Sequence, residues 1–171
     1  MVRQPGQQPT TSCLLRANSP APLVVDMGDG VIDVDKLKKH VYDVIGAIHS
    51  VHDELGAGVN EYCYQEALEW ELADRGIPFK REMSFHPLYK GHFLKAEYRV
   101  DFLCKGDIVI ECKAVDALNA TMRAQLFNYM RLLKASCGII VNFAPKFAEI
   151  ERYFFDVARG VILTVTGEII K

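Results

Sequence analysis

Paired cysteines, long apolar runs and an excess of positive charge are all missing from this sequence. The five cysteines are an odd number, widely spaced and never arranged as Cys-x-x-Cys, which argues against a zinc ribbon and against a disulfide framework. No stretch approaches the roughly 18 apolar residues that span a bilayer. The net charge of −2 is not that of a protein that coats nucleic acid electrostatically. We therefore expect an intracellular protein of a reducing compartment, the cytoplasm or nucleus, and leave open an enzyme that meets nucleic acid through a local basic patch and a metal.

The length of 171 residues suits one domain, and a composition of 50% hydrophobic and 25% charged residues is that of an ordinary globular protein. Residues 1–32 hold four prolines and few large apolar side chains, so we expect a disordered leader there and a single domain over 33–171. The leader contains Arg3, Arg16 and several Ser and Thr, and no acid before Asp26. An organelle transit peptide shares these features, although a plain disordered leader explains them equally well.

The remaining pattern alternates between helical and extended periodicity. Leu37, Val41, Val44, Ile48 and Val51 recur at helical spacing, and short breaks at Lys90-Gly91 and Lys105-Gly106 separate β-prone runs. The expected elements are helices at about 35–55, 60–75, 119–134 and 147–158, an antiparallel meander over 79–89, 93–104 and 107–114, a buried parallel strand at 138–143, and a closing extended pair at 161–165 and 168–170. This order predicts an α/β domain of the α+β mixed-sheet type, α-β-β-β-α-β with an extra N-terminal helix.

Three charged residues interrupt the apolar strands of the meander. Glu111 and Lys113 follow the apolar run 108–110, and alternate strand residues share a face. Asp101 lies between apolar neighbours on the preceding strand. Burying unpaired carboxylates is costly, and two on adjacent strands repel each other unless a proton, a basic partner or a metal intervenes. The pattern therefore predicts a Mg²⁺ or Mn²⁺ site formed by Asp101, Glu111 and the backbone carbonyl of Cys112, with Lys113 beside it. A plain ion pair of Lys113 with Glu111 or Asp101 is the competing interpretation.

Other polar side chains are expected on the same region of the sheet. Glu61 is a charge inside the apolar stripe of the second helix, so it should face the sheet; the alternative is a carboxylate favoured by the helix N-terminus. Gln125 and Tyr129 lie four residues apart and share a face of the helix that follows the Glu-x-Lys strand. For Tyr129 the alternative is a core residue.

Several spaced motifs resemble one known family. Gly58-Val59-Asn60-Glu61-Tyr62-Cys63-Tyr64 is similar to the GxxExxY signature of the family that bears this name. Further segments of that pattern are Tyr98-Arg99-Val100-Asp101-Phe102-Leu103, Ile110-Glu111-Cys112-Lys113, Gln125-Leu126-Phe127-Asn128-Tyr129 and Asn142-Phe143. The resemblance covers roughly residues 37–157 and places the chain with the PD-(D/E)XK nuclease superfamily.

The resemblance implies roles for individual residues. Asp101 and Glu111 resemble the metal-binding acids, Lys113 the catalytic lysine, and Glu61 the helix-borne acid that completes the metal site in many members. Gln125 and Tyr129 resemble the Gln-x-x-x-Tyr element of the exonuclease branches. His52 also matches a position that is often histidine in the family, but its place beside an apolar stripe favours a packing or hydrogen-bonded role.

These observations predict a divalent-metal-dependent nuclease that hydrolyses phosphodiester bonds of nucleic acid, DNA in preference to RNA. Candidate phosphate contacts are Arg99, Arg123, Lys95 and Lys80, although Arg99 is equally well explained by a salt bridge with a near neighbour. The alternative is a catalytically inactive nuclease-fold module for binding or assembly, which the acidic net charge favours. The closing strands could supply an edge for a homodimer. A small-molecule phosphohydrolase is disfavoured because the sequence contains no glycine-rich phosphate loop.

Overall fold

The computed structural model describes residues 34–170, and the expected leader at 1–32 lies outside them. A seven-stranded mixed sheet forms the centre of the domain, in the order β1-β4-β5-β6-β7-β8-β9. Its strands are β1 (Phe79–Phe85), β4 (Tyr98–Cys104), β5 (Ile108–Lys113), β6 (Cys137–Asn142), β7 (Glu149–Asp156), β8 (Val161–Thr164) and β9 (Ile169–Ile170). β5 and β6 are parallel, and every other neighbouring pair is antiparallel.

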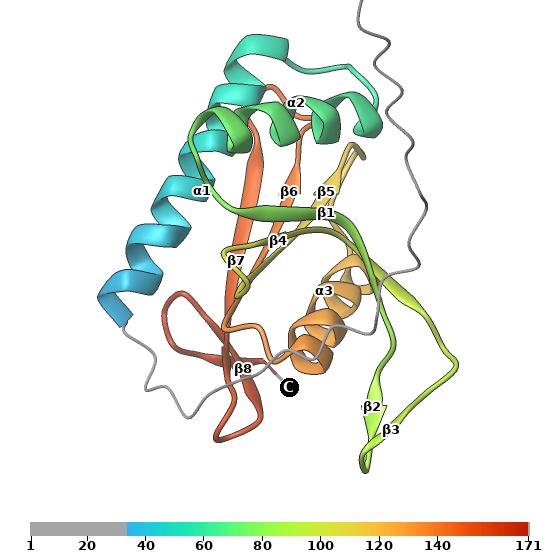
Figure 1. The fold of residues 1–171 in the computed structure, drawn as a ribbon. Helices are drawn as coiled ribbons and strands as arrows, with labels where there is room; N and C mark the ends of the chain where they lie inside the picture. Colours follow the sequence, from blue (N-terminus) through green and yellow to red (C-terminus); the bar gives the residue numbers. More distant parts are fainter. Residues whose placement is uncertain (1–33, 171) are drawn as a thin grey trace, which may run out of the picture.

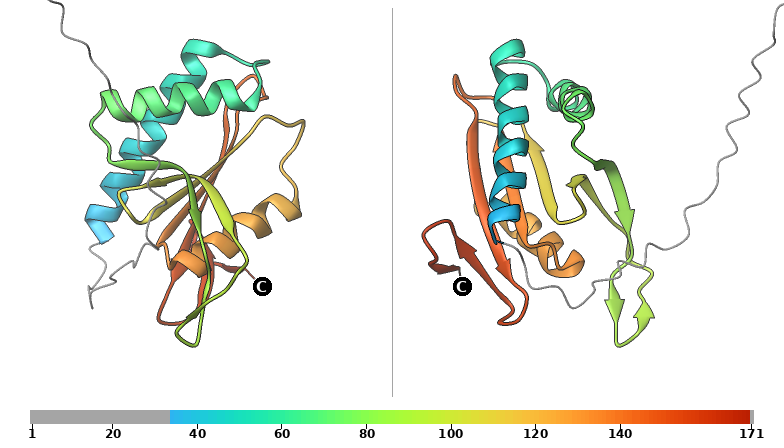
Figure 2. Two further views of the ribbon diagram at one scale, coloured as in Figure 1. Left: turned by 45° about the vertical axis from the view of Figure 1, so that its right-hand side comes forward. Right: turned by 60° about the vertical axis from the view of Figure 1, so that its left-hand side comes forward.

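Helices cover both faces of this sheet. α1 (Val34–Leu55) and α2 (Glu61–Asp74) lie on one face, and α3 (Ala120–Leu133) lies on the other (Figures 1 and 2). The apolar core is divided accordingly: Ile48, Leu68 and Ile110 belong to the cluster under α1 and α2, whereas Leu126 and Ile140 belong to the cluster under α3. The element order from α2 onward is α-β-β-β-α-β, as the sequence predicted.

Two departures from the predicted elements concern extended segments. The run at 79–104 contains an additional hairpin, β2 (Leu88–Tyr89) and β3 (His92–Phe93), which forms a separate two-stranded sheet. The helix predicted near 147–158 is wrong, because β7 occupies 149–156 and pairs with β6 and β8. Ile150, Tyr153 and Phe154 are at helical spacing, but both faces of β7 are covered, so its apolar residues need not alternate.

A tyrosine fixes the connection between α1 and α2. The Tyr64 hydroxyl donates a hydrogen bond to the Gly56 carbonyl at 2.6 Å and accepts one from the Val59 amide at 3.3 Å. Its ring stacks on Phe143, with centroids 4.6 Å apart. Gly58 in the same loop has a φ of +97°, a conformation that favours glycine. The glycine and the final tyrosine of the GxxExxY-like segment therefore shape the loop that precedes Glu61.

His52 has a packing role of the kind predicted for it. Its side chain is buried, and Nε2 lies 3.0 Å from the Pro145 carbonyl oxygen. The imidazole also stacks near Phe143, with ring centroids 6.4 Å apart. These contacts connect the end of α1 to the segment that follows β6.

Candidate active site

The sheet is interrupted at Asp101. The ladder between β4 and β5 ends at the pair Phe102↔Ile110. The ladder between β1 and β4 omits the pair Glu82–Asp101, and Glu82 has a φ of +47°, which is rare for a residue with a side chain. Backbone amides near Asp101 are therefore free to bond to side chains instead of to a neighbouring strand.

The Asp101 carboxylate takes the place of one missing backbone partner. Its Oδ2 accepts a hydrogen bond of 2.8 Å from the Cys112 amide on β5. The backbone amide of Asp101 also lowers the pKa of the Glu111 carboxyl. Burial raises the pKa of Asp101, and the hydrogen bond from Cys112 and the charge of Lys113 oppose that rise. The two acids predicted from separate strands thus lie together, and the Asp101 side chain holds β4 to β5.

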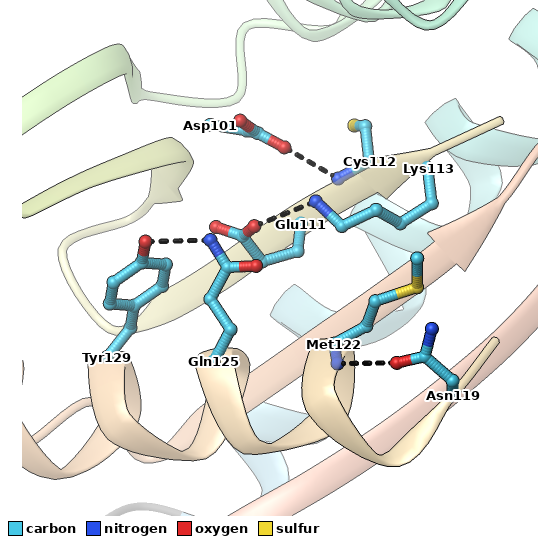
Figure 3. Close-up of polar contacts among 8 residues, drawn as sticks. All are labelled: Asp101, Glu111, Cys112, Lys113, Asn119, Met122, Gln125 and Tyr129. Atoms are coloured by element: carbon cyan, nitrogen blue, oxygen red, sulfur yellow. Dashed lines mark hydrogen bonds and ion pairs between the residues drawn. The ribbon is translucent and has the colours of Figure 1, made fainter. Parts of the chain in front are cut away.

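Glu111 is a buried carboxylate with one oxygen unsatisfied. Only 1% of the residue is exposed; Oε2 accepts a hydrogen bond from Lys113 Nζ at 3.1 Å, and Oε1 is buried without a hydrogen-bond partner (Figure 3). Burial, and then the charge of Asp101, raise the pKa of Glu111 to about 7 against the opposing charge of Lys113. An unsatisfied buried carboxylate oxygen is costly, so a proton or a cation at this atom would stabilise the site.

Lys113 lies among these acids and remains charged. Burial by itself would lower the pKa of its ammonium group, but the charges of Glu111 and Asp101 outweigh burial, and the pKa is raised. The ion pair with Glu111 that formed the competing interpretation is therefore present. It does not satisfy the whole cluster, because Oε1 of Glu111 stays unpaired.

Glu61 reaches this cluster from α2, which lies on the face of the sheet opposite to α3. It begins α2, where the Asn60 side chain caps the helix by accepting a hydrogen bond of 2.9 Å from the Cys63 amide. Burial raises the pKa of Glu61, which also responds to the charges of Lys113 and Asp101 and to a hydrogen bond from the Ala114 backbone. The half-buried carboxylate therefore faces the carboxyl end of β5 rather than open solvent.

Gln125 and Tyr129 complete the site from α3. Gln125 Nε2 donates a hydrogen bond of 2.8 Å to the Tyr129 hydroxyl, and both side chains lie beside Glu111 (Figure 3). Burial raises the pKa of Tyr129, Gln125 opposes the rise, and the charges of Glu111 and Asp101 add to it. α3 is held over the sheet by a bidentate pair between Arg123 and Glu151, at 2.7 and 2.6 Å.

The predicted phosphate contacts are not all in one place. Arg123 is engaged by Glu151 on β7, and Arg99 lies 3.5 Å from Glu82. Lys80 and Lys95 are exposed, the first on β1 and the second after the β2–β3 hairpin. Of the four, only Arg99 is close enough to the acids to affect the pKa of Asp101.

Sequence reasoning missed Glu82, whose negative charge acts on Asp101. Glu82 is exposed on the edge strand β1, where a charged residue is ordinary, so its pattern carried no signal. It also missed Gln65, which is buried one turn after Glu61 on α2. A polar residue four positions from Glu61 on the same helix face was the available indication.

The donor set fits a cation that needs few protein ligands. Among residues 34–170, no three His, Cys, Asp or Glu side chains form a ready cluster for a metal ion. Mg²⁺ is commonly held by one or two carboxylates together with water and substrate phosphate, and not by an all-protein cage. The unpaired Oε1 of Glu111, with the Asp101 carboxylate nearby, is compatible with that mode.

The other described features restrict further chemistry. The four cysteines of the described part of the chain are free, and Cys104, Cys112 and Cys137 are buried. Burial raises the pKa of the Cys112 thiol, so it is a poor nucleophile. No described helix has both the length and the apolar character needed to cross a bilayer.

Comparison with known proteins gave a family and two structural likenesses. A solved structure titled "Crystal structure of SSO0001" aligns with 74% of this chain at 21% identity and a TM-score of 0.45, and the aligned part spans 64% of that protein. A search of curated proteins returned no match. The narrower resemblance to the GxxExxY family stays a prediction. A family model described as "PD-(D/E)XK nuclease superfamily" matches residues 38–153, which is more than half of the sequence and includes every predicted site residue. The chain belongs to the PD-(D/E)XK nuclease superfamily.

Proposed function

We propose that this protein is a divalent-metal-dependent nuclease that hydrolyses phosphodiester bonds, with DNA as the preferred nucleic acid. The observation that carries the proposal is the buried, unsatisfied Oε1 of Glu111 next to Asp101 and Lys113. A structural ion pair alone would have no use for a second carboxylate and an orphaned oxygen at an interrupted point of the sheet. A metal ion would stabilise all of these groups together.

The metal site is assigned to Asp101 and Glu111, with the Cys112 carbonyl and Glu61 contributing directly or through water. Mg²⁺ or Mn²⁺ suits these oxygen ligands. When bound, such an ion supplies Lewis-acid polarisation of a phosphoryl oxygen and a lower pKa for an attacking water.

Lys113 acts as a fixed positive charge and hydrogen-bond donor. Because its pKa is raised, it stays protonated at neutral pH and does not serve as a base. Its ammonium group would orient the attacking water and stabilise negative charge that develops on the phosphoryl group. Its hydrogen bond to Glu111 keeps the flexible side chain in position before substrate arrives.

Gln125 and Tyr129 position groups at the same place. The hydrogen bond between them fixes the Gln125 amide beside Glu111, where it can orient a water or a phosphate oxygen. We assign these residues to the substrate side of the site, and Arg99, Lys80, Lys95 and Arg123 to candidate phosphate contacts. A homodimer through β9, which lies at one edge of the sheet, would suit cutting of both strands.

The direct test is cleavage by purified protein. Plasmid and single-stranded DNA are incubated with the wild type, Lys113→Ala and Lys39→Ala in Mg²⁺ or Mn²⁺; Lys39 is an exposed lysine of α1 and serves as the control. Cleavage by the wild type and Lys39→Ala, and none by Lys113→Ala, supports the proposal. Equal cleavage by all three proteins would mean a contaminating nuclease and would remove the catalytic assignment.

A catalytically inactive module for binding or assembly is the second candidate. Two observations favour it: the described residues contain no preformed cluster of three metal-ligating side chains, and Lys113 already neutralises one oxygen of Glu111. Calorimetric titration with Mn²⁺ separates the two candidates. Binding that disappears in Asp101→Asn supports the enzyme, whereas no binding at millimolar Mn²⁺ supports the module.

A further inference from the structure

The β2–β3 hairpin projects from the body of the domain (Figure 1). It is inserted between β1 and β4, and its two register pairs are Leu88↔Phe93 and Tyr89↔His92. Lys90 and Gly91 form the turn with φ values of +49° and +83°, which is typical of a tight two-residue hairpin. A hydrogen bond of 2.9 Å from the Leu94 amide to the Pro87 carbonyl lengthens the ribbon toward its base. The hairpin is therefore a defined ribbon and not an irregular loop.

Large apolar side chains on this ribbon are left in water. Leu88 is 60% exposed, Tyr89 59%, Phe93 51% and Leu94 43%. Residues directly opposite each other share a face, so Leu88 and Phe93 lie on one face and Tyr89 lies on the other. The projecting ribbon thus presents an exposed aromatic ring on each of its two faces, and each ring can bind a flat, apolar group.

The charge of the hairpin differs from that of the whole chain. Residues 86–95 contain His86, Lys90, His92 and Lys95 and no carboxylate, while the chain has a net charge of −2. The Lys90 ammonium lies 5.4 Å from the Tyr89 ring centroid. Lysines interleaved with exposed aromatic rings suit a polyanion that carries planar groups. Single-stranded nucleic acid has this chemistry, since its bases stack on aromatic side chains and its phosphates bind lysine.

An aromatic cluster connects the hairpin to the candidate active site. Phe85 and Tyr98, which pair across β1 and β4 at the base of the hairpin, stack with centroids 5.8 Å apart. Both rings also meet Tyr129 edge to face, at 6.2 and 6.1 Å. Tyr98 lies three residues before Asp101 on β4, a distance of about 10 Å along a strand. A strand bound on the hairpin would thus pass Tyr98 before it reaches the carboxylates.

We propose that the hairpin 86–95 binds single-stranded nucleic acid and leads it to the site at Asp101 and Glu111. The strand crosses the ribbon, so that one base stacks on Tyr89 on one face and another on Phe93 on the other face, and Lys90 and Lys95 contact the phosphates. Duplex is a poor ligand because the faces of its bases are already stacked on each other. The binding stands on the hairpin alone, and the delivery to a cutting site rests on the proposed function.

Binding is measured by fluorescence anisotropy with a labelled 20-nucleotide single strand, using the full chain in EDTA so that no cleavage occurs. Tyr89→Ser/Phe93→Ser is expected to weaken binding about tenfold or more, given the strength of base–aromatic stacking. Tyr42→Ser, which removes an aromatic ring that is 78% exposed on α1, is the matched control and keeps wild-type affinity. Lys90→Ala/Lys95→Ala is expected to reduce the salt slope of log K by about 1.4.

Three results would overturn the proposal. The first is wild-type affinity in Tyr89→Ser/Phe93→Ser, and the second is equal affinity for a blunt duplex of the same length. The third is a light-scattering change from dimer to monomer in that variant without a change in DNA affinity, which would make the hairpin a contact between two copies of the chain. Single-stranded RNA in place of DNA tests the preferred sugar.

The same experiments keep this proposal separate from the nuclease assignment. A wild type that binds the single strand in EDTA but cuts nothing in Mn²⁺ would remove the nuclease and leave the hairpin as a binding element. A wild type that cuts in a Lys113-dependent manner, with hairpin variants that bind normally, would remove the hairpin and leave the nuclease.

Discussion

The Asp101 carboxylate accepts a hydrogen bond from the Cys112 amide at 2.8 Å, one residue beyond the point where β4 and β5 stop pairing. The Asp101 side chain therefore accepts a hydrogen bond that a backbone carbonyl would accept in a continuous ladder. The same side chain is a candidate metal ligand. A structural role and a proposed chemical role therefore meet at this residue. They can be separated, because the amide needs an oxygen acceptor of any charge, whereas a cation needs the carboxylate.

Replacing Asp101 in two ways should separate these roles. Asp101→Asn keeps an oxygen for the Cys112 amide and removes a buried charge. The free energy of unfolding without metal should therefore stay the same or rise. Asp101→Ala leaves the amide without its partner and should cost about 1–3 kcal/mol. Both variants should lose Mn²⁺ binding. Urea denaturation in EDTA and calorimetry test this, and equal loss of stability in the two variants would contradict it.

The raised pKa of Glu111 predicts that stability without metal falls as pH rises. The folded protein holds a proton on Glu111 up to a pKa of about 7, while the unfolded chain releases it near the ordinary pKa of 4.5. The folded state therefore binds more protons between these values, and its stability is full below pH 4.5 and declines up to pH 7. Glu111→Gln should flatten this decline and, at pH 8, gain up to about 3 kcal/mol.

The measurement is urea denaturation at several pH values in EDTA. Raised pKa values of Asp101 and Glu61 act in the same direction, so a smaller slope should remain in Glu111→Gln. Mn²⁺ should reverse the trend in the wild type, since the cation binds the deprotonated carboxylate. A wild-type stability that rises from pH 5 to pH 7 in EDTA would contradict the burial of this group.

Tyr64→Phe should lower both the free energy of unfolding and the affinity for Mn²⁺. The variant keeps the ring on Phe143 but loses the hydroxyl contacts with Gly56 and Val59 that shape the loop before Glu61. We expect a cost of about 1 kcal/mol. The control is Tyr62→Phe, which alters an exposed neighbour on α2. If Tyr64→Phe loses more Mn²⁺ affinity than this control does, the loop positions Glu61. Identical Mn²⁺ affinities in the two variants would limit Tyr64 to a packing role.

The ion pair between Arg123 and Glu151 allows a test of whether Arg123 is structural or contacts phosphate. If its role is structural, a double-mutant cycle of Arg123→Ala and Glu151→Ala should give a coupling of about 1 kcal/mol, reduced from that of a buried pair because both groups are partly exposed. The two single variants should then weaken DNA binding equally. If Arg123→Ala weakens DNA binding far more than Glu151→Ala does, the arginine contacts phosphate, as the sequence suggested.

The parts of the site that the sequence predicted are those that break a strong local pattern. Asp101, Glu111 and Lys113 were detectable because charges are costly in strands whose neighbours are apolar. Glu61, Gln125 and Tyr129 were detectable from helical spacing together with the family motifs. The gap in the β1–β4 ladder at Asp101, where Glu82 has an unusual conformation, could not be deduced from spacing alone.

The errors arise where long-range contacts decide the structure. The segment 147–158 was predicted as a helix, but it is a strand because β6 and β8 pair with β7 on both sides. β2 and β3 were predicted as the ends of two longer strands, 79–89 and 93–104, since the Lys90-Gly91 turn was assigned to the meander itself. The ion pair between Arg123 and Glu151 was not predicted either. Residue 151 was expected on a helix, so it could not be placed beside α3.

Glu61 approaches the carboxyl end of β5 from α2, whereas Gln125 and Tyr129 approach from α3 on the other face of the sheet. The two halves of the site consequently belong to different packing units. A brief detachment of α2, far short of global denaturation, would remove one acid and leave the other groups in place. Amide hydrogen exchange in α2 should then report how often α2 detaches and Glu61 leaves the site. A bound cation that holds Glu61 should slow the exchange there.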